Sequence, residues 1–337
     1  MIGTEGSPPP ASPAVTVRRR RWLTVLLWLL VAPFAVWAAA RVLGLEGVYP
    51  SIQLLAFTPY VAAVSLVPLA LAALTKRIWP AITAAVVVLA FAACVLPRSV
   101  PGTDAGDPDG PTVRVMTVNM LYGQADPGQI VRLVREGGVD LLAVQEYSAH
   151  GQAALRAAGL EETLPNAVTY PRENAGGSAV YSRFPLADQG YRQLTSFVQA
   201  HASVRVPGGP DVYVESAHPC APIGRGSGAC WRADLAAQPA ASPGGPVTVL
   251  MGDFNSTLDH KAFRRVVTKG YRDAADSAGT GLSPSWPYDD RWYFPGVTLD
   301  HILADQRVRV RNVRIIHIAG SDHRAVFAEL VLPKAGA

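Results

Sequence analysis

Long apolar runs occupy the first part of the chain, and short ones occupy the rest. Three nearly uncharged stretches cover residues 22–42, 51–74 and 78–96. Each is close to the length of about 20 residues that a membrane-spanning helix needs. A buried core helix explains any one of them, but three in succession leave little polar chain to cover them, so the pattern predicts three transmembrane helices. A cleaved signal peptide is the alternative for the first stretch, and Trp28 and Pro33 in its centre count against it.

After these stretches the pattern changes to short β-like runs that alternate with helix-like segments. One helix is expected to open at Pro127 and to close at Gly137 and Gly138, and a second is expected to have Ser148 as its N-cap. Strand-like runs outnumber the helices. This pattern predicts an α/β fold in which two packed β-sheets are flanked by helices.

Two segments without apolar periodicity mark the boundaries. Residues 1–21 begin with a stretch rich in Pro, Ser and Ala and are expected to form a disordered tail. Residues 97–111 are rich in Pro, Gly and Asp and are expected to form a linker. The globular domain is therefore predicted to occupy residues 112–337.

Charge also separates the two parts of the chain. Six cations, at positions 18–21 and 76–77, flank one side of the predicted spans, whereas only Arg41 and Arg98 flank the other. Lys and Arg near span ends are retained in the cytoplasm, which predicts a multi-pass protein of the cell membrane with a cytoplasmic N-terminus and an extracytoplasmic globular domain. Beyond residue 100 the chain has 22 Lys and Arg against 24 Asp and Glu. This balance disfavours nucleic acid as a partner, because proteins that bind the phosphate backbone usually carry excess positive charge.

The three cysteines agree with this topology. Cys94 lies within the third apolar stretch, where it acts as a small apolar residue. Cys220 and Cys230 flank a Gly-rich loop in the domain that is expected outside the cytoplasm, where oxidising conditions favour a disulfide. Two free thiols or a pair of metal ligands are the alternatives. A disulfide would fix the segment that follows His218.

Several apolar runs end in a side chain that can bind a metal or transfer a proton. Asn119 and Glu146 supply a neutral oxygen and a carboxylate, which suit a hard divalent cation. We expect Mg²⁺, with Mn²⁺ as the alternative. Asp253 and Asn255 are two residues apart, so in a continuing strand they would project from the same face. One could then orient an attacking water while the other holds a phosphoryl oxygen.

Two histidines complete the set. His323 has the pKa range of a general base near neutrality, and Asp300 is a candidate to hold its second ring nitrogen. Asp322 is a candidate for the metal or the leaving group. His218 is expected to act as a general acid or to stabilise charge on the phosphoryl group. His301 follows Asp300 directly and would point to the opposite face of the strand, so it is excluded.

The motifs that carry these residues occur in a fixed order, as VNM, VQE, SAVYSRFPL, SAHP, GDFN, LDHIL and SDHRAV. In this order, residues 113–332 resemble the endonuclease/exonuclease/phosphatase superfamily. The resemblance implies a four-layered α/β sandwich, a divalent metal that is usually Mg²⁺, and in-line attack of water on a phosphodiester, phosphomonoester or pyrophosphate. It implies metal binding by Asn119, Glu146 and Asp322, phosphate contacts by Asn119, His218 and Asn255, and catalysis by His218, Asp253, Asn255, Asp300 and His323.

The order of three spans followed by such a domain also resembles the teicoplanin-resistance membrane proteins of actinomycetes. That resemblance implies a role in antibiotic resistance and a lipid phosphate or pyrophosphate substrate, such as undecaprenyl pyrophosphate, in the lipid bilayer. No protein partner is predicted. The alternatives are an exported endonuclease or phosphodiesterase, a sphingomyelinase-like phospholipase, and a binding protein without activity. Four aromatic residues of one loop are candidates to meet the bilayer or a lipid tail: Trp286, Trp292, Tyr293 and Phe294.

Overall fold

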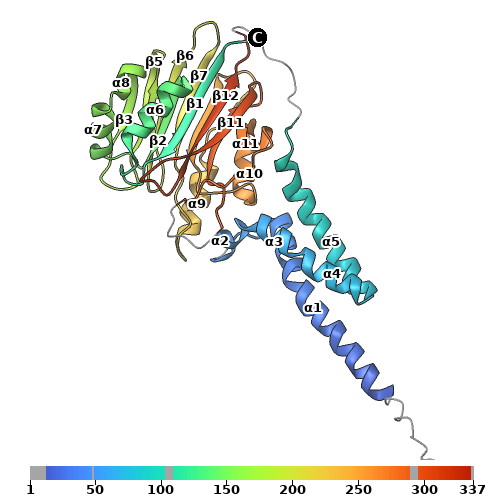
Figure 1. The fold of residues 1–337 in the computed structure, drawn as a ribbon. Coiled ribbons are helices and arrows are strands. Elements are labelled where there is room, and N and C mark those ends of the chain that lie inside the picture. Colours follow the sequence, from blue (N-terminus) through green and yellow to red (C-terminus); the bar gives the residue numbers. More distant parts are fainter. Residues whose placement is uncertain (1–12, 48, 103–108, 289–294, 335–337) are drawn as a thin grey trace, which may run out of the picture.

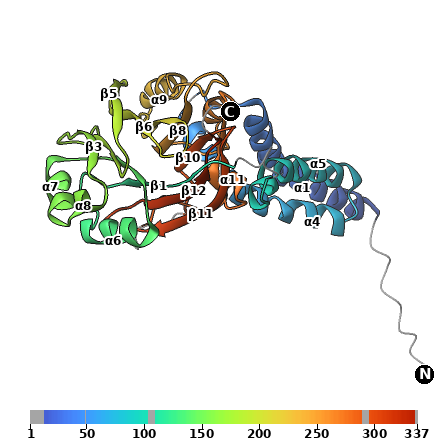
Figure 2. The same ribbon diagram turned by 90° about the horizontal axis from the view of Figure 1, so that it is seen from above.

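Two six-stranded β-sheets packed face to face form the body of the molecule, and the N-terminal helices extend away from one end of it (Figure 1). The computed structural model describes residues 13–47, 49–102, 109–288 and 295–334. Helices pack against the outer face of both sheets, so the sandwich has four layers (Figure 2). This architecture confirms the predicted α/β sandwich.

The two sheets have the same arrangement of strands. The first has the order β11 (Arg309–His317), β12 (Arg324–Val331), β1 (Thr112–Asn119), β2 (Leu141–Gln145), β4 (Ser178–Ser182) and β3 (Asn166–Tyr170). The second has the order β5 (Leu186–Gln193), β6 (Val198–Arg205), β7 (Asp211–Ala217), β8 (Val247–Asp253), β10 (Asp300–Asp305) and β9 (Tyr271–Asp273). One pair in each sheet is parallel, β1 with β2 and β7 with β8, and the other neighbours are antiparallel. The carboxyl ends of the parallel strands therefore lie beside the amino ends of β10 and β12.

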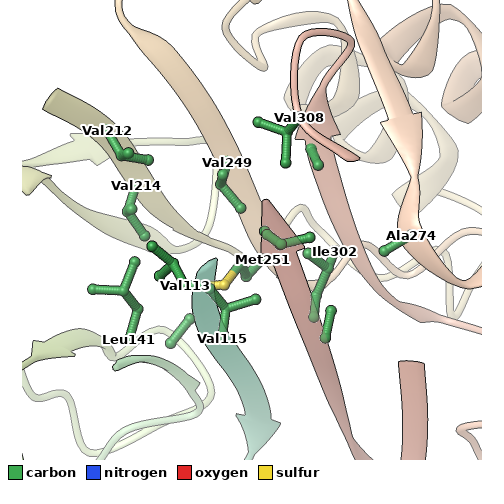
Figure 3. Packing of buried hydrophobic residues seen from close by; sticks show 14 of the residues in the cluster. Val113, Val115, Leu141, Val212, Val214, Val249, Met251, Ala274, Ile302 and Val308 are labelled. Carbon is green, nitrogen blue, oxygen red and sulfur yellow. The ribbon is translucent and has the colours of Figure 1, made fainter. Parts of the chain in front are cut away.

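The main hydrophobic core lies between the sheets (Figure 3). Successive side chains of a strand point to opposite faces, so Val113 and Val115 of β1 enter this core, while Met116 and Val118 pack on the other side of the sheet. Helices α6 (Pro127–Gly137), α7 (Ala149–Ala157) and α8 (Leu160–Thr163) cover the first sheet, and α9 (Ser227–Ala236) and α10 (Lys261–Val267) cover the second. The short helix α11 (Ala274–Ser277) contributes to the core between the sheets.

The helix ends that the sequence predicts are present. Helix α6 has Pro127 in its first turn, and it ends before Gly138, which adopts a left-handed backbone with φ of 58°. Its N-cap is Asp126, whose side chain accepts a hydrogen bond from the backbone N–H of Gln129. Ser148 caps α7 by accepting from the N–H of Gly151. These contacts satisfy backbone groups that a helix leaves unpaired at its termini.

Five helices form the N-terminal module: α1 (Pro13–Leu43), α2 (Ser51–Leu55), α3 (Thr58–Val64), α4 (Leu66–Leu74) and α5 (Ile78–Val95). A 3₁₀ helix, η1 (Leu96–Ser99), leads from α5 toward the sandwich. Helix α1 begins within the stretch expected to be a disordered tail, and η1 extends from the last residue of the third predicted span into the expected linker.

In the described part of the chain, two helices are long and apolar enough to cross a membrane, Arg21–Leu43 and Ile78–Ser99. The predicted span at residues 51–74 is instead divided among α2, α3 and α4. Pro59 and Pro68 lie in the first turns of α3 and α4, where a missing backbone N–H is tolerated. Residues 58–74 form a shorter apolar helical segment, so a third crossing stays a prediction.

The predicted disulfide between Cys220 and Cys230 is present, and Cys94 is a free thiol. The disulfide closes the loop between β7 and α9. It therefore fixes the segment that directly follows His218.

Candidate active site

The polar residues that end the predicted strands lie at one edge of the sandwich, on the side that faces α2 (Figure 1). Asn119 and Asp253 are the last residues of β1 and β8, and Glu146 and His218 directly follow β2 and β7. Asp300 begins the antiparallel strand β10, and His323 directly precedes β12. The strand directions thus bring residues from six strands to one site.

Asp253 is at the centre of the cluster. Its Oδ2 lies 3.2 Å from Nδ2 of Asn119 and 3.7 Å from Nε2 of both His218 and His323. Its Oδ1 accepts a hydrogen bond of 2.8 Å from the backbone N–H of Asn255. Burial raises the pKa of Asp253 above its usual value.

The strand β8 ends at Asp253, so the expectation that Asp253 and Asn255 project from one strand face is wrong. Asn255 has a left-handed backbone with φ of 48°, and its side-chain amide donates to the carbonyl oxygen of Pro219 at 3.0 Å. Glu146 also has a positive φ, of 52°. Such backbones are uncommon for residues other than glycine and recur at functional sites. Both side chains nevertheless line the same cavity.

A close approach of two strands explains the glycine of the GDFN motif. A Cβ atom on Gly252 would collide with the carbonyl oxygen of Ala217 in the neighbouring strand β7. Glycine therefore allows β7 and β8 to pack closely just before His218 and Asp253. The motif combines this packing requirement with its polar residues.

His323 forms a buried pair with Asp300, as the sequence predicts. The two side chains share a hydrogen bond of 2.8 Å between Nδ1 and Oδ2, which leaves Nε2 facing Asp253. Burial alone would lower the pKa of His323, but the charges of Asp300 and Asp253 outweigh it and raise the pKa to about 10. The imidazole is therefore positively charged at neutral pH.

His218 has the opposite ionisation. Burial lowers its pKa to about 4, although the charge of Asp253 acts in the other direction. Its backbone N–H donates to Oε1 of Gln199 at 2.9 Å, and its ring stacks on Phe197 with 4.4 Å between centroids. A neutral His218 and a charged His323 differ from the protonation states that a general acid at His218 and a general base at His323 would need.

The carboxylates of Glu146 and Asp322 lie on the open side of the cluster. Glu146 accepts hydrogen bonds from Nδ2 of Asn119 at 3.1 Å and from the backbone N–H of Tyr122 at 3.0 Å. Burial raises the pKa of Glu146. Oδ2 of Asp322 accepts from Nε1 of Trp286 at 3.0 Å, while its buried Oδ1 has no hydrogen-bond partner among the described residues.

These groups fit a hard divalent cation. Candidate ligand atoms of Asp253, Asp300 and His323 lie within 4.8 Å of one another, a set that differs from the predicted Asn119, Glu146 and Asp322. The amide of Asn119 contacts both Asp253 and Glu146 and so links the two sets. Buried carboxylates that face one another without Lys or Arg favour a cation between them.

The cluster opens into a cavity of about 540 Å³. Its polar end contains the catalytic candidates, and its other walls are mainly apolar. Part of that wall comes from α2 and the turn after it, with Ile52, Ala56 and Phe57. None of the described residues that line the cavity is Lys or Arg.

Some residues of the site escape prediction from the sequence. Trp286, a candidate to meet the bilayer or a lipid tail, lines the cavity and donates to Asp322, a contact that the sequence does not predict. Trp292, Tyr293 and Phe294 lie outside the described residues. Phe197, in the turn between β5 and β6, stacks on the ring of His218, and Gln199 of β6 accepts a hydrogen bond from its backbone N–H. No sequence motif predicts either contact. The contribution of α2 is also unexpected, because its apolar pattern is that of a membrane span.

His301 belongs to a separate buried pair. Its Nδ1 lies 2.5 Å from Oδ2 of Asp273, and its Nε2 lies 2.9 Å from the carbonyl oxygen of Ser256. Its ring packs against Phe263 on the outer side of the second sheet. Strand alternation thus directs Asp300 and His301 to different environments.

Comparisons with known proteins agree with this geometry. The sequence profile described as the Endonuclease/Exonuclease/phosphatase family matches residues 116–323. The fold is similar to that of an endonuclease/exonuclease/phosphatase from Beutenbergia cavernae, at 19% identity and a TM-score of 0.52 over 66% of this chain and 72% of the other. A Bacteroides vulgatus endonuclease/exonuclease/phosphatase gives 17% identity and a TM-score of 0.52 over 66% and 99% of the two chains.

A humanized TDP2 of D. rerio gives 12% identity and a TM-score of 0.50 over 65% of this chain and 98% of the other. These structural likenesses concern the fold. No curated protein matches the chain in sequence.

Proposed function

Because the chain belongs to the endonuclease/exonuclease/phosphatase family, we propose that it is a metal-dependent phosphohydrolase that acts on the phosphate or pyrophosphate of a membrane lipid. The three activities in the family's description all cleave phosphate esters with water. The substrate therefore has to be inferred from the cavity. Undecaprenyl pyrophosphate is the lipid that we propose, as the overall architecture suggests.

The observation that carries this proposal is the shared cavity. The residues able to act on a phosphate and the apolar residues of the N-terminal module line the same space. A lipid phosphate matches this arrangement of polar and apolar residues, because it has a charged head and an apolar tail. A nucleic acid backbone would instead require cationic side chains along its path, and the lining supplies no Lys or Arg among its described residues.

The residues support in-line attack of water on phosphorus. Asp253 would orient the water and accept its proton, and the raised pKa of this carboxyl favours that step. His323, charged and held by Asp300, would donate a proton to the leaving oxygen when the bond from phosphorus to that oxygen breaks. Neutral His218 and the amide of Asn255 would contact the phosphoryl oxygens.

A divalent cation, when bound, would neutralise charge on the phosphoryl group. We propose that Asn119, Glu146 and Asp322 hold it, next to Asp253. The raised pKa of Glu146 supports this assignment, because burial of its carboxylate outweighs the charge of the nearby His323. Oδ1 of Asp322 lies 3.9 Å from Nε2 of His323 and accepts no hydrogen bond among the described residues, which leaves it available to a cation. Mg²⁺ is the proposed ion, since oxygen donors dominate the set.

We further propose that the N-terminal helices anchor the enzyme in the cell membrane and that residues 112–337 lie outside the cytoplasm. Two long apolar helices support the anchor, and the asymmetric distribution of Lys and Arg supports a cytoplasmic N-terminus. The location of the domain outside the cytoplasm also requires that the shorter apolar segment, residues 58–74, forms a third crossing. The phosphate would then be cleaved at the outer surface of the membrane. A role in antibiotic resistance remains a proposal based on the overall architecture.

A substrate panel tests the proposed function. Purified full-length protein in detergent with Mg²⁺ is expected to release phosphate from undecaprenyl pyrophosphate, and the Asp253→Asn variant is expected to lose this activity. Sphingomyelin and plasmid DNA serve as the competing substrates. Cleavage of DNA or sphingomyelin, with the lipid pyrophosphate untouched, would refute the lipid phosphate proposal.

A further inference from the structure

Helix α2 packs on the catalytic domain, although the sequence predicts it within a membrane span. Ile52 is 2% exposed and belongs to the hydrophobic cluster of the second sheet, with Trp231 and Phe254. The carbonyl oxygen of Ile52 accepts a hydrogen bond of 2.7 Å from Nε2 of His260. The side-chain amide of Gln53 donates to the carbonyl oxygen of Pro222 in the disulfide-closed loop. Helix α2 is therefore fixed against the rim of the active site.

A buried ion cluster holds the end of α1 and the 3₁₀ helix η1, which follows α5, to the same domain. Oδ1 of Asp259 lies 2.7 Å from Nε of Arg41, at the end of α1. Both oxygens of Asp259 also accept from Arg98 of η1, at 2.7 Å and 2.8 Å. All three side chains are at least nine-tenths buried. One carboxylate thus connects the two long apolar helices to the segment that follows the GDFN motif.

Glu46 lies in the segment between α1 and α2 and makes a second connection to the catalytic domain. Its carboxylate accepts from the backbone N–H groups of Lys261 and Ala262 at 2.6 Å and 2.5 Å. Arg41, Arg98 and Glu46 thus attach three segments to one region of the domain. These segments are the end of α1, the 3₁₀ helix after α5, and the turn between α1 and α2. Helix α2 has little freedom to move away from the cavity.

Phe57, in the turn after α2, is the aromatic residue of the module that lines the cavity. It is half-buried, and its ring lies 6.4 Å from that of Tyr60. Ile223 lines the same cavity from the disulfide-closed loop and is 85% exposed. Exposed apolar side chains at the mouth of a cavity indicate an apolar ligand or the lipid phase. The cavity is continuous from these residues to His323 and Asp253.

We propose that Phe57, with Ile52 and Ala56, forms the subsite for the hydrocarbon chain of the lipid, and that Asp259 positions this subsite through Arg41 and Arg98. The N-terminal module would then select the substrate by its chain, while the strand-end residues act on its phosphate. This inference rests on the proposed function. Phe57 is a specificity-determining residue in this account, and Asp259 is a positioning residue.

Chain-length selectivity tests the subsite. We compare kcat/KM for undecaprenyl pyrophosphate with kcat/KM for short-chain geranyl pyrophosphate, using full-length protein in detergent with Mg²⁺. In the Phe57→Ala variant, the ratio of kcat/KM for the long-chain substrate to kcat/KM for the short-chain substrate is expected to fall about tenfold. The reason is that the long chain loses an apolar contact that the short chain never makes. The Leu54→Ala variant is the matched control, since Leu54 is 46% exposed on the same helix and does not line the cavity.

An unchanged ratio in the Phe57→Ala variant would overturn the subsite. An equal fall in the Leu54→Ala variant would also overturn it, because the effect would then come from the helix as a whole. If wild-type protein hydrolyses neither pyrophosphate but cleaves DNA or sphingomyelin, the proposed function fails, and the inference fails with it. Hydrolysis of both pyrophosphates without selectivity overturns the inference alone.

Asp259 is tested in the same assay. The Asp259→Asn variant is expected to lower the long-to-short ratio through KM of the long substrate, and Asp259→Glu is expected to restore part of it. A purely structural role predicts a loss of folded protein with the ratio unchanged in the remaining fraction. A loss of folded protein with an unchanged long-to-short ratio would therefore remove Asp259 from the proposal.

Discussion

His218 and His323 lie at equal distances from Asp253, yet their proton affinities differ by orders of magnitude. Nε2 of each ring is 3.7 Å from Oδ2 of Asp253. Only His323 has a second carboxylate, Asp300, on its other nitrogen. Both rings are fully buried, and the charges of Asp300, Asp253 and Asp322 together raise the pKa of His323 to about 10, while burial lowers that of His218 to about 4. The neighbours of a histidine thus determine whether it donates or accepts a proton at neutral pH.

His323→Ala is expected to lower kcat at least about 100-fold, since it removes the proton donor of the leaving oxygen. Thermal unfolding of the purified variant should begin at a lower temperature than that of wild type, because the buried carboxylates of Asp300 and Asp253 lose their positive partner, so kcat is compared at a temperature where both proteins are folded. His317→Ala is the matched control and should keep wild-type activity, since His317 is exposed at the end of β11. Turnover at the wild-type rate in His323→Ala would remove this residue from the mechanism.

Glu146→Gln is expected to separate stability from activity. Burial raises the pKa of Glu146, so its charged form opposes folding when no cation is bound, and the neutral amide should raise the thermal midpoint of EDTA-treated protein. The same change should raise the Mg²⁺ concentration for half-maximal activity at least about tenfold. Titration of both proteins with Mg²⁺ measures the shift. An unchanged Mg²⁺ requirement would contradict the assignment of Glu146 to the cation.

The structure brings together the predicted site residues that lie at the ends of strands. Asn119, Glu146 and Asp253 interrupt apolar runs, and their polarity is visible in the sequence. Gln199 and Trp286 hold His218 and Asp322 through contacts between segments distant in the chain. Such contacts depend on the packed fold, so no local pattern predicts them, even for Trp286, which the sequence already marks as a candidate lipid contact.

Local signals also predict the ends of α6 at Pro127 and Gly138 and the N-cap of α7 at Ser148, because a helix end is satisfied within its own turn. Helix α2 shows the limit of this approach. Its residues are as apolar as a membrane span, but Ile52 packs against the second sheet and its helix ends before Phe57. An apolar pattern indicates burial, and it does not distinguish lipid from a neighbouring domain.

The Asp259 cluster predicts a defined pH dependence at the junction of these elements. Burial would raise the pKa of Asp259, but Arg98 and Arg41 outweigh it and hold the pKa below its usual value. The stabilisation is therefore complete above the unfolded pKa of about 4 and is lost as pH falls through the lower, folded value. Asp259→Asn leaves two buried arginines unpaired and should cost about 3–5 kcal/mol at neutral pH.

Thermal unfolding of wild type and Asp259→Asn in detergent, from pH 7 to pH 3, measures this dependence. The difference in free energy of unfolding between the two proteins should stay constant down to about pH 4 and become smaller below it. Arg114 provides a control pair, because its contact with Glu329 is exposed and Glu329→Gln should have an effect below about 1 kcal/mol. If wild type and Asp259→Asn had nearly the same free energy of unfolding at neutral pH, the Asp259 cluster would contribute little to stability.

For the whole molecule, the two-sheet architecture follows from the order of strand-like runs, whereas the number of membrane crossings does not. The described structure contains two long apolar helices, and the intervening segment is broken into short helices. Topology is therefore open to a direct test. A C-terminal alkaline phosphatase fusion should be active and a green fluorescent protein fusion dark, because the domain is expected outside the cytoplasm. The reverse result would place the catalytic domain inside.

The central claim is that the strand-end cluster and helix α2 act on one molecule of lipid phosphate. A structure of the full-length Asp253→Asn protein with Mg²⁺ and undecaprenyl pyrophosphate tests it most directly. We expect the pyrophosphate between His218 and His323, with the hydrocarbon chain beside Phe57. A lipid bound elsewhere on the molecule, with this cavity free of it, would contradict the claim.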